Sequence, residues 1–407
     1  MQEFIPFFII LLIAVVFSWA FARARIPWVV SLIVGGIIAG PNGFGWFSGN
    51  ETIDFLATIG LVFLMFMAGL EAKLSELKDI KADIAIIGLF IGILPPLVGT
   101  GIILSFGYGL TPAILMGIVF MSPAIAMLLP QFQANNILTT KLGRTIVSST
   151  VIIDALSLLL LSVFLQFATG GGPSVSSLLV YPFAMVLLGA FAWVLPRVRW
   201  LVVPRPAKDA PDMFERELRF TILVLIGLVV FFEFIGLHAI IAGFFGGMIL
   251  SHAMDSAIIK AKLHAISYGF FVPIFFVSVG ANTDLSVFTE GLRPLIITFV
   301  VVVALVISKF FSGWIGARLS GLDNLSSMLV GSSAIPQLAT ALAVAFLGFG
   351  EGILPPELLS AVIGMVIVTS VVAPIFVSIL SRRIMSQAHP TTRSNALSEM
   401  PSSDVHA

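Results

Sequence analysis

The 407-residue sequence contains no cysteine, and only 10% of its residues are charged. Without cysteine the chain can form neither disulfides nor thiolate metal sites, and the redox compartment stays undetermined. A soluble domain typically has about 25% charged residues, so a chain that is 58% hydrophobic lacks the polar surface that water requires. The lipid bilayer is the solvent that fits. The formal net charge is zero, which gives no indication of nucleic acid as a partner.

Motifs for several kinds of membrane machinery are missing as well. The sequence has no GxxxxGK[ST] loop for ATP phosphates and no HExxH pair for zinc. Primary pumping and membrane proteolysis therefore lack their machinery, and we expect neither enzyme activity nor a cofactor. The N-terminus lacks the basic region and cleavage site of a secretory signal, so we expect the first apolar stretch to be a retained helix.

Long apolar runs predict thirteen transmembrane helices, because about 20 apolar residues can cross a bilayer as a helix with every backbone group satisfied. Two runs, 27–40 and 238–251, are short and could be tilted or half buried by neighbours. The predicted spans are 4–22, 27–40, 53–71, 84–106, 112–130, 143–168, 175–196, 219–236, 238–251, 264–281, 294–318, 325–348 and 357–380.

The basic residues support this count and indicate an orientation. Of the 21 Lys and Arg residues, 19 fall into alternate loops or the C-terminal tail, whereas the intervening loops hold only Arg293 and one span holds Lys309. Lys and Arg accumulate on the cytoplasmic side of short loops. We therefore expect a multi-pass protein of the cell inner membrane with its N-terminus outside and its C-terminus in the cytoplasm.

The longest polar connection, residues 197–218, is rich in proline and charge and divides the predicted helices into two sets. An even number of helices per set would give parallel repeats. Six helices on each side of a linking helix at 175–196 would instead give repeats of opposite orientation, a common transporter plan. Residues 384–407 are polar, and we expect them to form a disordered tail.

Two proline-containing segments favour the inverted arrangement. The fifth predicted helix contains Ser122-Pro123 at mid-span, and the twelfth contains Pro336-Gln337. Proline removes a backbone donor and clashes with the preceding turn, so both helices should break near the middle. Broken helices at matching positions in two halves indicate a transporter's binding site. The alternative is that these prolines only kink their helices.

Asp154 lies in the middle of the span 143–168. A charge in hydrocarbon costs at least about 2.5 kcal/mol, so such a residue usually has a partner and a function. A carboxylate held between the cost of burial and the attraction of a nearby cation can bind either a proton or a metal ion. Thr150, one turn earlier on the same face, could contribute its hydroxyl. The alternative is a protonated Asp154 that serves only as a structural hydrogen-bond donor.

Lys309 is the second ionisable residue deep in a span. It lies 9 residues, roughly 13 Å of helix, from Arg318 at the boundary, which is far for a lysine that extends its ammonium to the interface. It could pair with Asp154 or neutralise the C-terminal end of a broken helix. Glu233, near the outer end of its helix, could line a vestibule or serve only in helix pairing.

Several glycine-rich segments occur in a fixed order: IPWVVSLIVGGIIAGPNGFG, LVFLMFMAGLEAKLSEL, Leu142-Gly143-Arg144, HAIIAGFFGGMIL and FFVPIFFVSVGANTDL, followed by Lys309. Each is a weak signal alone. In this order and spacing, over about residues 5–382, they strongly resemble the monovalent cation:proton antiporter-2 family, which includes NapA-like sodium/proton antiporters and Kef-like potassium efflux systems.

The resemblance implies an all-α membrane fold of the NhaA/NapA type, with thirteen helices in two inverted six-helix repeats and crossed broken helices. Within a transmembrane domain at 1–383, residues 84–168 and 294–380 would form a moving core. Residues 4–71 and 219–281 would form a scaffold and the interface of a homodimer. The function implied is exchange of a monovalent cation for a proton across the bilayer by alternating access.

Site roles follow from the same resemblance, residue by residue. Asp154 matches the residue that carries the ion and the proton, Thr150 a nearby ligand and Lys309 the core basic residue. Ser122 occupies a position that is often acidic in sodium-transporting relatives, and Ile153 one that is usually Asp, Asn or Gln. A site with one carboxylate predicts electroneutral 1:1 exchange and makes K⁺ as plausible as Na⁺.

Two other classes of protein remain open. A cation channel or an organic-anion/Na⁺ symporter could use a related broken-helix fold, although such symporters do not need a lysine at Lys309 and a channel conducts without a proton gradient. A sensor or assembly component could use Asp154 and Lys309 only as a structural lock. An assay of cation-dependent proton release with Asp154→Asn distinguishes the three.

Overall fold

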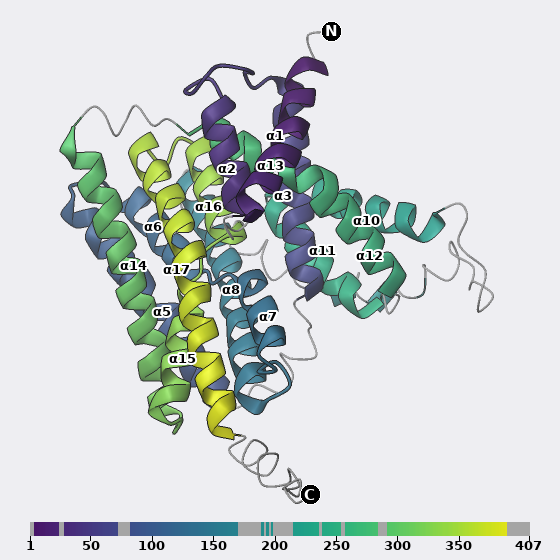
Figure 1. Cartoon of the computed structure of the whole chain (residues 1–407). Coiled ribbons are helices and arrows are strands. Elements are labelled where there is room, and N and C mark those ends of the chain that lie inside the picture. Colours follow the sequence, from purple (N-terminus) through teal and green to yellow (C-terminus); the bar gives the residue numbers. More distant parts are fainter. Residues whose placement is uncertain are drawn as a thin grey trace, which may run out of the picture.

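The computed structural model describes residues 4–23, 28–71, 82–169, 189–190, 193–194, 197, 215–235, 238–253, 257–283 and 291–388. All regular secondary structure in this part of the chain is helical. The predicted linking helix at 175–196 lies largely outside the described residues. Of the disordered tail predicted at 384–407, residues 384–388 instead continue the last helix, α17 (Pro356–Ala388), and residues 389–407 lie outside the described residues. The helices gather into two groups, seen side by side in Figure 1.

The first group contains helices from the N-terminal part of the chain and from its middle, on the right in Figure 1. In it, α2 packs against α13 and α3 packs against α11. Its elements are α1 (Phe4–Arg23), α2 (Trp28–Ala39), α3 (Glu51–Glu71), α10 (Arg216–Phe234), α11 (Ala239–Ala253), α12 (Ala257–Ile266), η1 (Ser267–Phe271) and α13 (Val272–Ala281).

The second group combines helices from two distant parts of the sequence, on the left in Figure 1. In it, α14 packs against α5, α15 and α17, and α6 lies between α5 and α16. Its elements are α5 (Ala82–Ser105), α6 (Leu110–Met121), α7 (Ile125–Ala134), α8 (Lys141–Thr169), α14 (Leu292–Leu319), α15 (Asn324–Ala334), α16 (Ala339–Gly350) and α17 (Pro356–Ala388).

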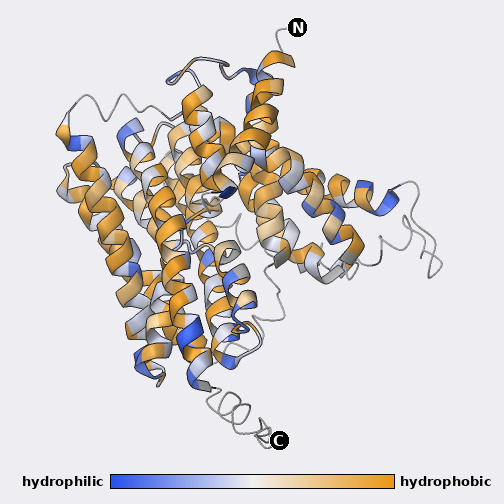
Figure 2. Ribbon diagram, viewed as in Figure 1, coloured by the Kyte–Doolittle hydropathy of each residue, from blue (hydrophilic) through white to orange (hydrophobic). Residues whose placement is uncertain are grey.

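The helices have the length and composition of membrane spans. Eight segments of the described chain are helical, apolar and long enough to cross a bilayer, and Figure 2 shows hydrophobic residues along most of their length. Large apolar side chains such as Phe8 and Trp19 on α1 are exposed on the surface of the protein. An apolar outer surface fits lipid as the solvent, so the chain is a multi-pass membrane protein.

Two predicted spans are each divided into two helices. The span 112–130 consists of α6 and α7, separated at residues 122–124, and the span 325–348 consists of α15 and α16, separated at 335–338. Ser122 has φ −67° and ψ 126°, the extended conformation that a following proline favours. Leu338 leaves the helical region with φ −154° and ψ −104°. Both separations fall at the prolines that predicted a break.

Glycines bring backbones of the first group into direct contact. A Cβ atom on Gly69 of α3 would lie 2.0 Å from the Phe244 carbonyl oxygen of α11. A Cβ atom on Gly280 of α13 would lie 2.1 Å from the Ile33 carbonyl oxygen of α2. No side chain fits at such distances, so glycine at these positions sets the spacing of both helix pairs.

Candidate functional site

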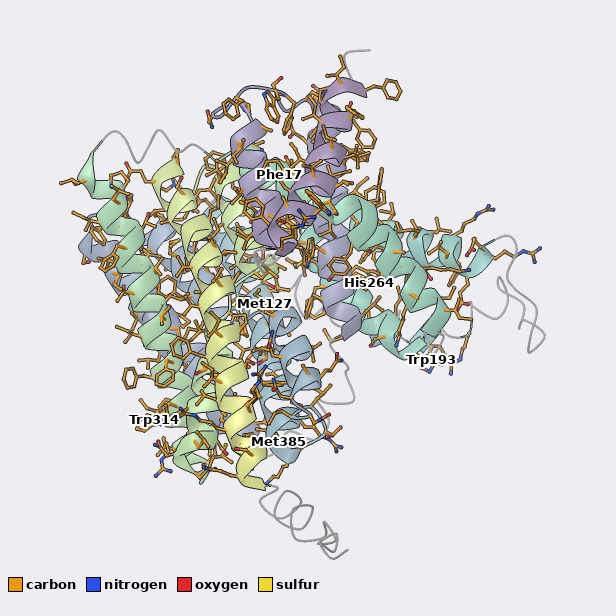
Figure 3. All side chains as sticks on the ribbon, viewed as in Figure 1. Phe17, Met127, Trp193, His264, Trp314 and Met385 are labelled. Carbon is orange, nitrogen blue, oxygen red and sulfur yellow. The ribbon has the colours of Figure 1, made fainter. Side chains whose placement is uncertain are left out.

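The two helix interruptions meet inside the second group. The Ala124 amide, at the start of α7, donates a 2.9 Å hydrogen bond to the Pro336 carbonyl oxygen. The Gln337 side chain donates through Nε2 to the Phe120 carbonyl oxygen near the end of α6, at 3.4 Å. Two segments far apart in the sequence thus satisfy each other's free backbone groups. Figure 3 shows Met127, in the first turn of α7, midway between the ends of the molecule.

Lys309 binds the C-terminal end of α6. Its ammonium donates two hydrogen bonds of 2.9 Å, to the carbonyl oxygens of Met121 and Ser122. The last carbonyls of a helix have no partner within it and carry partial negative charge, so a cation is favourable there. Lys309 is 0% exposed, which means that these backbone contacts replace its water.

Asp154 lies on α8 beside the same interruption. Its Oδ1 accepts a 2.8 Å hydrogen bond from the Ser122 hydroxyl, and the Thr340 side chain, in the first turn of α16, makes a second hydrogen bond with the carboxylate. Asp154 is 6% exposed and Thr340 is 4% exposed. The carboxylate is therefore buried between one hydroxyl that precedes α7 and another that begins α16.

Ser122 connects the two ionisable residues. Its carbonyl accepts from Lys309 while its hydroxyl donates to Asp154. Within the part of the chain that the structure describes, no ion pair of 4.0 Å or less joins Asp154 directly to Lys309. The lysine and the carboxylate are therefore linked through Ser122 and also interact electrostatically without direct contact.

The other predicted site residues lie around this centre. Thr150 is buried one turn before Asp154 on α8, and no hydrogen bond between the two occurs among the described residues. Pro123 and Pro336 are buried in the two interruptions, and Gln337 is buried with its amide on α6. Six of the seven predicted site residues thus lie in the two interruptions or contact them, and Thr150 lies one turn from Asp154 on α8.

Thr340 was not predicted as a site residue. In the sequence it is one of several Thr and Ser residues in the span 325–348. Its only distinguishing signal is its place four residues after Pro336, in the first turn that follows the break. The carbonyl groups that bind Lys309 have no signal in the sequence at all, since every residue has one.

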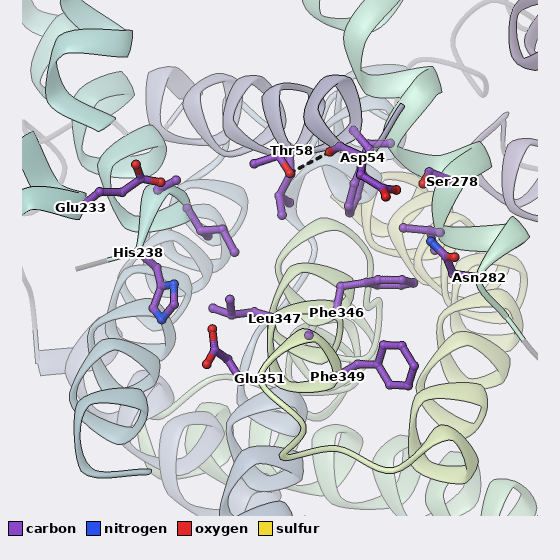
Figure 4. A pocket seen from close by; sticks show the side chains of 17 residues that line it. Asp54, Thr58, Glu233, His238, Ser278, Asn282, Phe346, Leu347, Phe349 and Glu351 are labelled. Atoms are coloured by element: carbon purple, nitrogen blue, oxygen red, sulfur yellow. Dashed lines mark hydrogen bonds between the residues drawn. The ribbon is translucent and has the colours of Figure 1, made fainter. Parts of the chain in front are cut away.

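A cavity of about 420 Å³ lies where the two groups of helices face each other. It is lined by α3 and α13 from the first group, by α16 from the second, and by Glu233 and His238 at the connection between α10 and α11. Figure 4 shows the side chains of Glu233, His238 and Glu351 along one side and Asp54 across from them. Glu233, predicted as either a vestibule or a packing residue, does line a cavity.

His238 has charged neighbours on both groups of helices. Burial lowers the pKa of its imidazole below the ordinary value, while the carboxylates of Glu351 and Glu233 act in the opposite direction. The histidine belongs to the first group and Glu351 ends α16 of the second. The electrostatic interaction between them therefore crosses the boundary between the groups.

The centre can hold a single small cation or a proton. A buried carboxylate and two hydroxyl groups supply hard oxygen ligands, which suit alkali and alkaline-earth cations rather than soft metals. The same carboxylate can take a proton, and then one hydroxyl accepts from it while the other donates. A cation and a proton at this carboxylate would compete, because both need the same oxygen atoms.

Comparison with known proteins covers almost the whole chain. The family model described as sodium/hydrogen exchanger, transmembrane, matches residues 9–383. The chain is 30% identical over 381 residues to a probable Na(+)/H(+) antiporter 3 of Methanocaldococcus jannaschii, covering 91% of this chain and 95% of that protein. It is 27% identical over 390 residues to a Na(+)/H(+) antiporter of Enterococcus hirae, covering 94% and 99%.

The fold is similar to that of a solved structure. The sodium proton antiporter MjNhaP1 of Methanocaldococcus jannaschii, at pH 8, superimposes with a TM-score of 0.69. The match covers 94% of this chain and 99% of that one at 15% sequence identity. At this identity the likeness concerns the arrangement of the helices alone.

Proposed function

Since the chain belongs to the sodium/hydrogen exchanger family, we propose that it exchanges a monovalent cation, Na⁺ or K⁺, for protons across the membrane by alternating access. It is a transporter and not an enzyme. The observation that carries the proposal is the buried Asp154 carboxylate between hydroxyl groups at two helix interruptions. The relatives whose names specify Na(+)/H(+) antiport favour sodium.

Exchange follows from competition at Asp154. A cation bound to the carboxylate excludes the proton, and a proton on the carboxylate removes the charge that holds the cation. If the centre opens to one side of the membrane at a time, each crossing carries either a cation or a proton. Ser122 and Thr150 would supply further cation ligands. Lys309 would keep the end of α6 in place in both states, because its partners are backbone carbonyls.

Electroneutral 1:1 exchange is the stoichiometry that the charges favour. The position before Asp154 holds Ile153, whose side chain is fully buried among apolar residues, and Ser122 supplies a hydroxyl instead of a second carboxylate. One carboxylate that carries one proton or one monovalent cation moves no net charge per cycle. A potential-sensitive dye in sealed vesicles should therefore stay silent during exchange driven by a pH gradient. A dye signal that depends on Asp154 would contradict this stoichiometry.

Alternating access would be a movement between the two groups of helices. The group with α5–α8 and α14–α17 would be the moving core, and the group with α1–α3 and α10–α13 the scaffold. The cavity at their boundary supports this assignment. We propose that the full chain has thirteen spans in two inverted six-helix repeats with a linking helix at 175–196.

The surroundings of the protein are proposed from the charge pattern and the resemblance. The N-terminus would be outside and the C-terminus in the cytoplasm of an inner membrane. The cavity would then face outward, since it lies at the ends of α3 and α13 that the basic residues assign to the outside. We also propose a homodimer that forms through the scaffold, which cross-linking in native membranes would test.

Reconstitution into vesicles with an internal pH dye tests the function. Addition of Na⁺, K⁺ or Li⁺ should release protons from wild-type vesicles and not from Asp154→Asn vesicles. Asp323→Asn is the matched control, because it makes the same change at a helix N-cap where Asn also caps well. Proton release that is equal in both variants would remove Asp154 from the mechanism, and cation flux without a proton gradient would indicate a channel.

A further inference from the structure

Thr340 has a contact that the family resemblance did not predict. It is the second residue of α16, it is buried, and its side chain is hydrogen-bonded to the Asp154 carboxylate. Ser122 contacts the same carboxylate from the other interruption. The transport carboxylate therefore has one hydroxyl partner on each of the two broken helices.

A hydroxyl group in this position can act in two ways. Its hydrogen rotates about the C–O bond, so it donates to a bare carboxylate or turns away and presents lone pairs. A small cation at the carboxylate would find those lone pairs beside it. Threonine is β-branched and stiff at χ1, so little conformational entropy is lost when its oxygen takes part in binding.

We propose that Thr340 is a ligand of the transported cation, which it binds together with Asp154 and Ser122. The inference rests on the proposed function and deepens it, because it places one ligand on the second broken helix. The bound cation then holds α16, α8 and the start of α7 together. When a proton replaces the cation, Thr340 again pairs with the carboxyl group, so neither state leaves the Thr340 hydroxyl without a partner.

The chain's lack of cysteine permits a sharp test. Thr340→Cys replaces a hard hydroxyl oxygen by a sulfur and removes the γ-methyl group, which Thr340→Ser removes as well, and the sulfur is then the only thiol in the protein. Soft sulfur ligands disfavour hard cations such as Na⁺ and favour soft ones, and Tl⁺ is a softer monovalent cation. The apparent KM values for Na⁺ and Tl⁺ are measured in vesicles by cation-dependent proton release.

The expected result is a change of preference. Thr340→Cys should raise the ratio of the KM for Na⁺ to the KM for Tl⁺ about tenfold or more relative to wild type, and Thr340→Ser should keep it within about twofold. Thr298→Cys is the matched control. The Thr298 hydroxyl is also buried and has no hydrogen-bond partner within the described chain, and it lies 11 residues before Lys309, roughly 16 Å along α14.

Other outcomes overturn the proposal. An unchanged ratio in Thr340→Cys, with or without a lower maximal rate, means that Thr340 only supports the fold. A ratio that shifts equally in Thr298→Cys means that the effect does not come from the site. If wild-type vesicles show no exchange, the proposed function fails. The ligand is then tested on purified protein by the rise in melting temperature that each cation produces, since a bound ligand stabilises the folded state.

Discussion

The ammonium group of Lys309 donates a 2.9 Å hydrogen bond to the main-chain carbonyl of Ser122. A second bond of the same length goes to the carbonyl of Met121. A buried lysine thereby substitutes for the missing next turn of an interrupted helix. The sequence allowed two roles for this lysine, as partner of Asp154 or as counter-charge of a helix end, and the geometry of this state favours the second.

Removal of the lysine should therefore destabilise the protein. Lys309→Met keeps most of the volume but leaves two carbonyl oxygens buried without a donor, at a cost of about 1–3 kcal/mol each. Lys309→Ala adds a cavity and should melt at a still lower temperature. Melting curves in detergent, with the exposed Phe299→Leu on α14 as control, check this. A Lys309→Met protein that melts and transports like wild type would show that the contacts have no role.

Ser122→Ala should separate the two functions of Ser122. The variant keeps the carbonyl that binds Lys309 and loses the hydroxyl that donates to Asp154. We expect a melting temperature close to that of wild type and a KM for Na⁺ raised about tenfold, the effect of one lost charge-assisted hydrogen bond or ligand. Thr150→Val should raise the KM less, because Thr150 does not contact the carboxylate in this state. An equal effect of both variants would mean that Thr150 is as strong a cation ligand as Ser122.

Tyr108 should make the stability of the protein fall as the pH rises in the alkaline range. Burial, reinforced by a hydrogen bond to Glu357, raises the pKa of its phenol from 10.0 to about 12. The folded state keeps this proton where the unfolded state releases it, so the contribution is full below pH 10 and is lost as the pH rises from 10 towards 12. Tyr108→Phe should melt lower than wild type at pH 8, and the difference should shrink above pH 10. A constant difference would mean that only packing is lost.

His238 should make the stability of the protein depend on pH in the acidic range, where stability should fall as the pH decreases. Burial lowers its pKa, so below the ordinary value of 6.5 the unfolded state binds the proton more readily than the folded state. Stability should therefore fall as the pH decreases from about 6.5, and the carboxylates of Glu351 and Glu233 oppose this in part. His238→Gln should lose less melting temperature between pH 7 and pH 5 than wild type. A larger loss would show that the carboxylates outweigh burial.

The glycine contacts predict unequal effects of the same substitution. Gly69→Ala would force a Cβ atom to 2.0 Å from the Phe244 carbonyl oxygen, so α3 and α11 must separate. We expect a loss of several kcal/mol or no folded protein. Gly227→Ala on α10 meets nothing within 4 Å and should be neutral or stabilising by up to about 1 kcal/mol. Equal melting temperatures for the two variants would rule out close backbone contact.

The sequence predicted those features that depend on local chemistry. Proline in mid-span favours a break, so the interruptions at Pro123 and Pro336 were predictable, although Pro95, Pro96 and Pro374 stand inside helices that continue past them. The burial of Asp154 and Lys309 within apolar spans was predictable as well. The contact between Thr340 and Asp154 was not predictable, because it joins residues far apart in the sequence and any of several hydroxyl groups could have made it. The carbonyl partners of Lys309 could not be predicted for another reason, since every residue has a backbone carbonyl and the residue type does not show which one is bound.

The glycine seams of the first group have a mechanical consequence. Where two helices touch backbone to backbone, no flexible side chain lies between them that could change rotamer and let one helix slide along the other. We therefore expect α2 with α13, and α3 with α11, to move as rigid pairs. Movement is then expected at the boundary between the two groups. The cavity there is lined by long side chains such as Glu233, Phe346 and Glu351. We therefore expect the first group to move as a rigid body and the side chains between the two groups to rearrange when the groups move.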